Sequence, residues 1–205
     1  MANSGQLLIL LSRDKVQFAS GGKVFTFALT ENLVKDLEIV NSDFFKNELT
    51  NYLKKNQILL SSAIILLSES VCFVSEEKDL ESFIENLPFD NPAGRVMGDK
   101  LIGTNKDLYQ NLCEVVGAIG AKIKMVSPIF IFKETTGVKE LNDSLIRFIL
   151  DNEEKYLSTT FTYSAPYIAS KPLFITKNPK MAKREKVLIG VFIALTVGFL
   201  IWLLT

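Results

Sequence analysis

The chain begins with short runs of apolar or alternating residues separated by polar turns. Three such runs cover residues 6–11, 15–20 and 23–29, and the turns between them are Ser12-Arg13-Asp14 and Ser20-Gly21-Gly22. Short strands joined by polar or glycine-containing turns form antiparallel hairpins. The pattern therefore predicts a three-stranded antiparallel meander. The following stretch, 33–39, has no clear period and is left unassigned.

Helical and strand patterns alternate over the next part of the chain. Ser42 is the expected N-cap of a helix in which Phe44, Phe45, Leu49, Tyr52 and Leu53 recur at helical spacing. The continuous apolar run 63–67 is typical of a strand that is buried on both faces. A short strand at 71–74 is expected to lead into a helix that Ser75 caps and Pro88 ends, with Leu80, Phe83, Ile84 and Leu87 on its apolar face. Residues 90–98 contain Asn-Pro-Ala-Gly and are predicted to form a loop.

A strand-helix-strand pattern follows this loop. A strand at 100–103 precedes Thr104-x-x-Asp107, which resembles a capping box, and the helix that starts there should end at Gly120. Strands are expected at 122–126 and 129–132, and an amphipathic helix at 138–155. Residues 157–168 are rich in Thr, Tyr and Phe and predict one or two further strands, whereas the Pro and Lys content of 170–186 indicates a linker.

The last part of the chain, 187–204, is a run of 18 residues without a charge. A helix of this length is about 27 Å long, close to the roughly 30 Å of a bilayer's hydrocarbon core. Trp202 lies near its far end, where it suits the aromatic belt of a membrane interface. We therefore predict one transmembrane helix over 187–205.

Basic residues precede this segment. Six positive charges and the single Glu185 lie in 171–186, and those closest to the predicted membrane are Lys177, Lys180, Lys183, Arg184 and Lys186. The positive-inside rule keeps such a flank cytoplasmic, which predicts a single-pass protein of the inner (plasma) membrane with its N-terminal domain in the cytoplasm. Gly190 and Gly198 are eight residues apart and form no GxxxG pair, so a homo-oligomer held by this helix stays an open alternative.

Composition narrows the classes of function. The chain has no His, which excludes Ser-His-Asp and Cys-His catalysis and His-ligated zinc. Its net charge of 0 also lacks the basic surplus that non-specific nucleic-acid binding requires, so no nucleic-acid partner is predicted. The net charge of 0 is the sum of two opposite parts. Residues 1–170 contain 17 Lys plus Arg and 22 Asp plus Glu, and residues 171–186 contain six Lys plus Arg and one Glu. The protein is therefore an acidic body joined by a basic segment to an uncharged tail.

The remaining candidates for chemistry are few. Cys72 and Cys113 are 41 residues apart in apolar surroundings, which predicts reduced, packed thiols in a reducing compartment. Glu77, Glu81 and Glu85 share a helix face and could attract a divalent ion weakly, but a solvated face is the favoured interpretation. Gly94-x-x-x-Gly98 lacks the spacing of a phosphate loop. We predict no catalytic residue, no cofactor and no metal site.

The order of these elements resembles that of the actin-like proteins of type IV pilus and type II secretion inner-membrane platforms, the PilM/GspL type, whose fold is related to ribonuclease H. The opening meander matches the first three strands of that fold, and residues 42–67 resemble its first helix and fourth strand. Four stretches resemble parts of the subdomain that is inserted in this group: Val71-Cys72-Phe73-Val74, Asn86-Leu87-Pro88-Phe89, residues 100–109, and the helix end Val116-Gly-Ala-Ile-Gly120.

This resemblance, which covers residues 6–132, implies an α/β fold: a partial actin-like domain over 1–169, with an inserted βαβαβ subdomain at about 69–132, then a basic linker over 170–186 and the transmembrane helix. It implies a non-enzymatic, membrane-anchored scaffold that recruits protein partners of a pilus or secretion assembly platform. Nucleotide-binding relatives carry an Asp-x-Gly phosphate loop in the first hairpin, but the turn here is Ser12-Arg13-Asp14, without Gly. The second actin-like half also does not fit between Phe132 and the linker, so we expect no ATP binding.

Two alternatives remain open. One is a tail-anchored adaptor or regulator, unrelated to pili, that holds a soluble partner at the membrane. The other is an enzyme that acts on a lipid-linked substrate through carboxylates or Lys, for which Asp14 and Asp99 are the candidate carboxylate pair.

Overall fold

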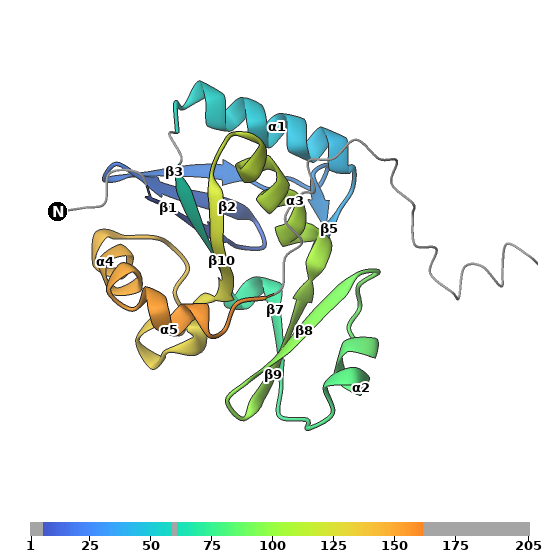
Figure 1. Cartoon of the computed structure of the whole chain (residues 1–205). Helices are drawn as coiled ribbons and strands as arrows, with labels where there is room; N and C mark the ends of the chain where they lie inside the picture. Colours follow the sequence, from blue (N-terminus) through green and yellow to red (C-terminus); the bar gives the residue numbers. More distant parts are fainter. Residues whose placement is uncertain (1–5, 59–60, 162–205) are drawn as a thin grey trace, which may run out of the picture. The chain divides into compact units, whose positions relative to one another are not determined.

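A five-stranded sheet forms the body of the protein in the computed structural model, which describes residues 6–58 and 61–161, all within a compact unit of residues 1–167 (Figure 1). Its strand order is β10-β6-β1-β2-β3. The antiparallel meander predicted from the sequence is confirmed as β1 (Gln6–Leu11), β2 (Lys15–Ser20) and β3 (Lys23–Ala28). The interior strand β6 (Ser62–Leu67) runs parallel to β1 on one side and to the edge strand β10 (Lys122–Pro128) on the other.

The central strands are buried because helices cover both faces of this sheet. On one face, Leu7, Ile9 and Leu11 of β1 share a core with α1 (Ser42–Lys55) and α3 (Lys106–Ala118). On the other face, the alternate residues Leu8 and Leu10 share a core with α4 (Asp143–Asp151) and α5 (Glu153–Leu157). Successive side chains of a strand point to opposite faces, so a continuous apolar run is what a strand covered on both sides requires.

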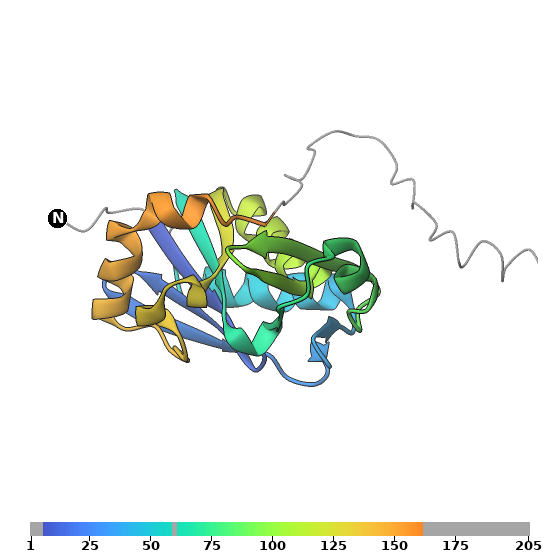
Figure 2. The same ribbon diagram turned by 90° about the horizontal axis from the view of Figure 1, so that it is seen from below.

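A smaller sheet lies to one side of the larger sheet in both views (Figures 1 and 2). It contains β7 (Cys72–Ser75), β9 (Lys100–Asn105) and β8 (Pro92–Met97) in the order β7-β9-β8, with antiparallel pairing throughout. The short helix α2 (Leu80–Glu85) packs on it. The insertion therefore has the order β7-α2-β8-β9 rather than βαβαβ, because β10 pairs with β6 in the larger sheet. The range 69–132 includes elements of both sheets.

The loop predicted at 90–98 is wrong, because β8 occupies Pro92–Met97. The Pro and Gly residues of this stretch indicate a loop when they are considered alone, but the neighbouring strand and helix allow them in a strand. Pro92 opens an edge strand, where a missing N–H is tolerated. Gly94 lies opposite Gly103 in the pairing of β8 with β9, and a Cβ at Gly103 would approach Leu87 Cδ1 to 2.5 Å. The two glycines thus leave room for the apolar face of the helix.

The predicted N-caps differ from the observed ones by one to four residues. Asn41, not Ser42, caps α1 by accepting a hydrogen bond from the Phe44 N–H. Asp79, not Ser75, caps α2, since the Ser75 hydroxyl lies at the end of β7 and accepts from the Glu77 N–H.

Asn105, not Thr104, caps α3. The Thr104 hydroxyl instead donates to the Val71 carbonyl, which ties β9 to the chain entering β7.

The unassigned stretch 33–39 forms a two-stranded hairpin of β4 (Val34–Lys35) and β5 (Glu38–Ile39). Its two turn residues, Asp36 and Leu37, have φ values of 51° and 66°. A positive φ is unfavourable for a bulky residue such as Leu. The buried side-chain amide of Asn105 donates to the Leu37 carbonyl at 3.0 Å, so a single residue caps α3 and holds this hairpin.

The chain after β10 differs from the predicted pattern. Residues 129–132, predicted as a strand, contain the 3₁₀ turn η2 (Ile129–Ile131), followed by η3 (Lys133–Thr135). The Ile129 carbonyl accepts from the hydroxyls of Thr135 and Tyr156 rather than from a neighbouring strand. The helix predicted at 138–155 is two helices, α4 and α5, that meet at Asn152. Residues 157–161 form no strand.

The predicted linker and membrane span lie outside the described residues. Within 6–58 and 61–161, none of the helices combines the length and the apolar character that crossing a membrane requires.

Candidate functional site

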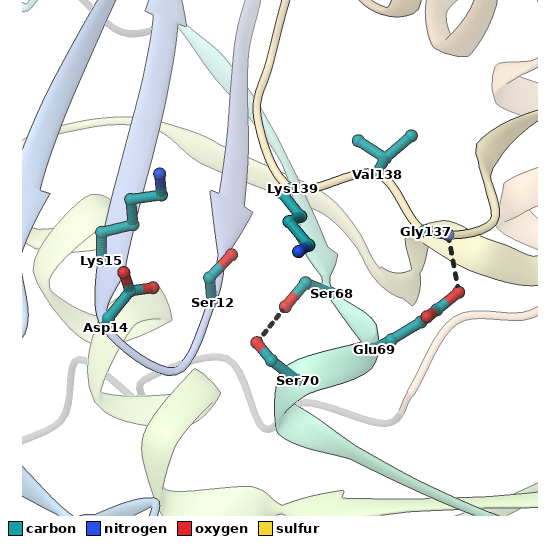
Figure 3. A pocket seen from close by; sticks show the side chains of 9 residues that line it. All are labelled: Ser12, Asp14, Lys15, Ser68, Glu69, Ser70, Gly137, Val138 and Lys139. Atoms are coloured by element: carbon teal, nitrogen blue, oxygen red, sulfur yellow. Dashed lines mark hydrogen bonds between the residues drawn. The ribbon is translucent and has the colours of Figure 1, made fainter.

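A cavity of about 430 Å³ opens at the carboxyl ends of β1 and β6 (Figure 3). It lies between the β1–β2 turn, the turn from β6 into the 3₁₀ helix η1 (Glu69–Val71), and the loop before α4. The lining residues are Ser12, Asp14, Lys15, Ser68, Glu69, Ser70, Gly137, Val138 and Lys139. Crevices at the carboxyl ends of parallel strands are the usual ligand sites of open α/β sheets, so this cavity is the first place to look for chemistry.

Two backbone N–H groups of the β1–β2 turn donate hydrogen bonds to other groups of the protein. The Ser12 N–H donates to the Lys15 carbonyl at 2.9 Å, which closes the turn. The Arg13 N–H donates to the Ser70 hydroxyl at 3.0 Å, and the hydroxyls of Ser68 and Ser70 are 2.7 Å apart. The turn is thereby bound to the chain that follows β6.

The loop before α4 is tied to the same edge of the sheet. The Gly137 N–H donates to the Glu69 carboxylate at 2.8 Å. Lys15 Nζ lies 2.6 Å from the Glu140 carboxylate. The Leu141 N–H donates at 3.0 Å to the side-chain oxygen of Gln17, which is buried in β2. These three contacts close the crevice from within the chain.

The ion pair between Lys15 and Glu140 keeps both groups charged. Its hydrogen bond raises the pKa of Lys15, against a smaller opposing effect of burial. The same hydrogen bond lowers the pKa of the Glu140 carboxyl. Lys15 is therefore engaged in holding the loop and is not a free cation for a ligand.

The cavity does not fit the phosphates of a nucleotide. Phosphate-binding nests present several free amides to the anion, usually through glycines. Here the amides of Ser12, Arg13 and Gly137 have partners within the protein, and the carboxylates of Asp14 and Glu69 line the cavity. The two carboxylates would repel an anion, against the attraction of Lys139, which also lines the cavity.

The other sequence candidates do not assemble into a site. Asp99 lies exposed on the turn between β8 and β9, and it does not line the cavity that contains Asp14. Glu77, Glu81 and Glu85 are exposed. In the described part of the chain, no group of three or more Cys, Asp or Glu side chains is arranged to hold a metal ion.

Both cysteines are free thiols. Cys113 is fully buried in α3, and burial raises the pKa of its thiol to about 12. Cys72 is half-buried in β7, and burial also raises the pKa of its thiol. Because the thiolate is the reactive form, neither residue has the properties of a nucleophile.

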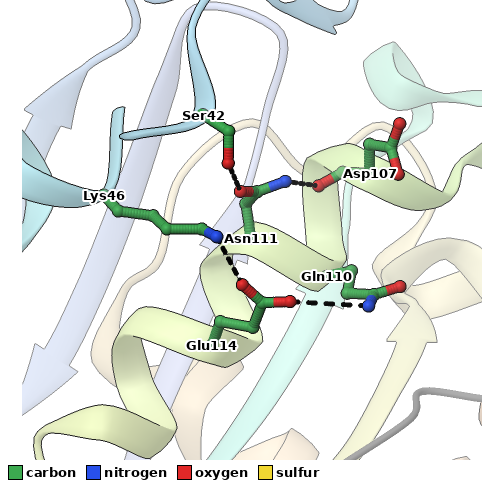
Figure 4. A network of polar contacts seen from close by, with 6 residues as sticks. All are labelled: Ser42, Lys46, Asp107, Gln110, Asn111 and Glu114. Carbon is green, nitrogen blue, oxygen red and sulfur yellow. Dashed lines mark hydrogen bonds and ion pairs between the residues drawn. The ribbon is translucent and has the colours of Figure 1, made fainter. Parts of the chain in front are cut away.

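A polar network between α1 and α3 was not foreseen from the sequence (Figure 4). Ser42 bonds to Asn111, whose amide donates to the Asp107 carbonyl at 2.8 Å. Lys46 forms an ion pair with Glu114. These residues lie 68 or more positions apart across the two helices, so no local pattern reveals them. Their arrangement fixes one helix against the other.

The residues predicted to contact the membrane, namely Lys177, Lys180, Lys183, Arg184, Lys186 and Trp202, lie outside the described residues.

No family model matches the chain, and no curated protein matches it either. Among solved structures it is similar to the PilM–PilN type IV pilus biogenesis complex, over 60% of this chain and 47% of that one, with 8% identity and a TM-score of 0.39. It is also similar to a Bacteroides thetaiotaomicron protein of unknown function with an actin-like ATPase fold, over 60% and 52% of the two chains, with 16% identity and a TM-score of 0.36.

A third similar structure is the cytoplasmic domain of EpsL, an inner-membrane component of the type II secretion system of Vibrio cholerae. It aligns over 60% of this chain and 55% of its own, with 16% identity and a TM-score of 0.32. The chain thus spans about half the length of these solved chains. They include PilM and a type II secretion component, the group that the predicted element order resembles.

The strand order itself identifies the architecture. An antiparallel meander is extended by two strands parallel to its first strand, and the smaller sheet is inserted between the fourth strand and the helix that leads to the fifth. This is the element order on which the resemblance to actin-like proteins rests. The cavity lies at the first hairpin of the larger sheet, and the carboxylates of Asp14 and Glu69 are among the groups that line it.

Proposed function

We propose that the protein is a non-enzymatic scaffold, held at the inner membrane by one C-terminal helix, that recruits components of a type IV pilus or type II secretion assembly platform. The class of partner comes from the resemblance in element order. PilM in complex with PilN and the EpsL domain, to which the chain is similar, are proteins of these two systems. The proposal places the acidic body, 1–169, in the cytoplasm.

The observation that carries the non-enzymatic part is that groups lining the crevice at the carboxyl ends of β1 and β6 are bound by the protein itself. A working nucleotide site needs free backbone amides and a cation directed at the phosphates. In this crevice the amides of Arg13 and Gly137 and the ammonium of Lys15 are bound by residues of the protein itself. These contacts stabilise the fold and leave neither those two amides nor Lys15 free for an anion; Lys139 also lines the crevice, together with the carboxylates of Asp14 and Glu69.

The tail supports the membrane part of the proposal. A span of 18 uncharged residues is long enough for the hydrocarbon core, and the basic segment before it suits an anionic cytoplasmic surface. Each basic residue near such a surface contributes about 1 kcal/mol of attraction. The segment would therefore hold the body close to the headgroups.

Fractionation of cells that express the full chain tests the anchor. We expect the full chain to stay in the membrane fraction after alkaline carbonate extraction, and a variant that lacks residues 187–205 to become soluble. The purified full chain in non-ionic detergent should neither bind nor hydrolyse ATP in the presence of Mg²⁺. Saturable ATP binding would contradict the closed crevice, and a soluble full chain would contradict the anchor.

A further inference from the structure

The outer edge of β7 lacks the protection that the other edge strands of the two larger sheets have. Proteins usually protect such edges with Pro, charged residues or covering contacts, because unpaired backbone groups recruit another strand. β8 begins with Pro92 and carries Arg95, whose guanidinium donates to the carbonyls of Ser158 and Thr160. The edge strand β3 carries Lys23, and its Thr26 carbonyl accepts from the Tyr52 hydroxyl. β7 reads Cys-Phe-Val-Ser, with neither Pro nor charge, and it pairs on one side only, with β9.

Apolar side chains are exposed on both faces of this edge. Phe73 is 40% exposed and Val74 is 48% exposed. As consecutive residues of a strand, they point to opposite faces of the sheet. The Phe73 ring packs edge-on against Phe89 at 5.5 Å, so part of its surface is already fixed in place. A strand added beside β7 would bury apolar area on both faces at once.

The charges beside this edge determine which kind of strand fits. The turn after β7 carries three exposed carboxylates and one Lys, namely Glu76, Glu77, Lys78 and Asp79. The carboxylates of α2 are not counted, because that helix packs on β8 and β9. A second copy of the chain paired parallel to β7 would bring two such acidic turns together, which like-charge repulsion opposes. A basic segment would be attracted, with a dependence on salt because the groups are exposed.

We propose that the outer edge of β7 binds an extended, basic segment of a partner protein as an added strand. The segment pairs with the backbone of β7 beyond Cys72, whose N–H already donates to the Glu69 carbonyl, and places its Lys or Arg residues against the acidic turn. Backbone hydrogen bonds supply affinity in this mode of recognition, and the side chains supply specificity. The inference rests on the proposed scaffold function, because it assigns one of the surfaces through which the domain recruits a partner.

A pair of matched peptides tests this assignment. The probe is a fluorescent synthetic peptide, Lys-Lys-Thr-Val-Thr-Val-Thr, and the control replaces both Lys with Glu. Anisotropy titrations use the full chain in non-ionic detergent at low salt. We expect the basic peptide to bind in a salt-dependent way and the acidic peptide not to bind. Hydrogen exchange should slow at the Val74 amide when the basic peptide is present, because the amides of a strand face its two edges alternately and those of Phe73 and Ser75 face β9.

Two substitutions locate the binding surface. Val74→Lys places a charge on the edge of β7, and we expect it to weaken binding about tenfold through repulsion of the basic peptide and loss of apolar contact. Val24→Lys is the matched control, since Val24 is 40% exposed on the edge strand β3. It should leave the affinity unchanged. Circular dichroism confirms that both variants fold.

Several results would overturn the assignment: no binding of the basic peptide, equal binding of both peptides, equal losses in the two variants, or exchange protection at β3 instead of β7. A concentration-dependent dimer of the full chain that Val74→Lys abolishes would make the occupant a second copy. These results are separable from the proposed function, because membrane extraction and ATP binding are measured without the peptide. If those two tests succeed and the peptide tests fail, only the edge assignment is wrong.

Discussion

Replacing Asn105 with Ala should destabilise the protein more than the loss of an ordinary helix cap. Asn105 is only 3% exposed. Its side-chain oxygen accepts from the Asp107 N–H at 2.9 Å, and its amide donates to the Leu37 carbonyl at 3.0 Å. Loss of a cap costs about 1 kcal/mol, and a buried carbonyl left without its donor costs a further 1–3 kcal/mol or so. We therefore expect a loss of about 3 kcal/mol in the free energy of unfolding.

Two further variants separate the two effects. Asn41 caps α1 from an exposed position, so Asn41→Ala should cost only about 1 kcal/mol. Asn105→Asp keeps the oxygen that caps α3 but sets a second, charged oxygen against the buried Leu37 carbonyl, so it should cost at least as much as Asn105→Ala. Urea unfolding of the full chain in non-ionic detergent, followed by far-UV circular dichroism, gives the free energies. If Asn105→Ala and Asn41→Ala cost the same, the bond to the β4–β5 hairpin contributes nothing and the reasoning fails.

Three more predictions follow from packing, charge and burial. Gly103→Ala should lower the free energy of unfolding by about 1–3 kcal/mol in the same urea assay, because the new Cβ would overlap Leu87. Unchanged stability would contradict that close approach. Burial raises the pKa of the Glu153 carboxyl, but hydrogen bonds from Lys124 and from a glutamine of β1 together lower it more, to below its ordinary 4.5. The stability that this carboxylate contributes is present above about pH 4.5 and is lost as the pH falls through its lowered pKa. Glu153→Gln should therefore reduce the fall in Tm between about pH 5 and pH 3, and a curve of Tm against pH parallel to that of the wild type would contradict this. Since burial raises the pKa of both thiols, Cys113 and Cys72 should react slowly with Ellman's reagent at pH 8 in the folded protein and rapidly in urea, and fast labelling of the folded state would refute their burial.

The larger sheet could be predicted from the sequence because its signals are local. The runs 6–11 and 63–67 are apolar over strand length, and a strand covered on both faces needs no other pattern. The turn Ser12-Arg13-Asp14 also shows, without any structure, that a glycine phosphate loop is missing. These features depend on neighbouring residues only, so tertiary contacts do not alter them.

The features that the sequence did not reveal depend on distant partners. β8 reads as a loop because Pro92 and Gly94 are strand breakers locally, and only the packing of α2 explains why a glycine suits that strand. The closed crevice depends on Glu69 reaching Gly137, 68 residues later. Asn105 and not Thr104 is the N-cap of α3, since the Thr104 hydroxyl donates a hydrogen bond to the Val71 carbonyl. The crevice and the N-cap of α3 were missed because polar side chains have long-range partners, and β8 was missed because its glycine is packed against α2.

The central claim, a membrane-anchored scaffold of an assembly platform, is tested most directly by identifying what the protein contacts in its own cells. Tagged full-length protein is crosslinked in intact cells, purified from solubilised membranes and compared by quantitative mass spectrometry with a variant that lacks residues 187–205. The account predicts that inner-membrane components of a type IV pilus or type II secretion system are enriched with the full chain and lost with the truncated one. Enrichment of unrelated proteins alone, or equal recovery with both chains, would contradict it.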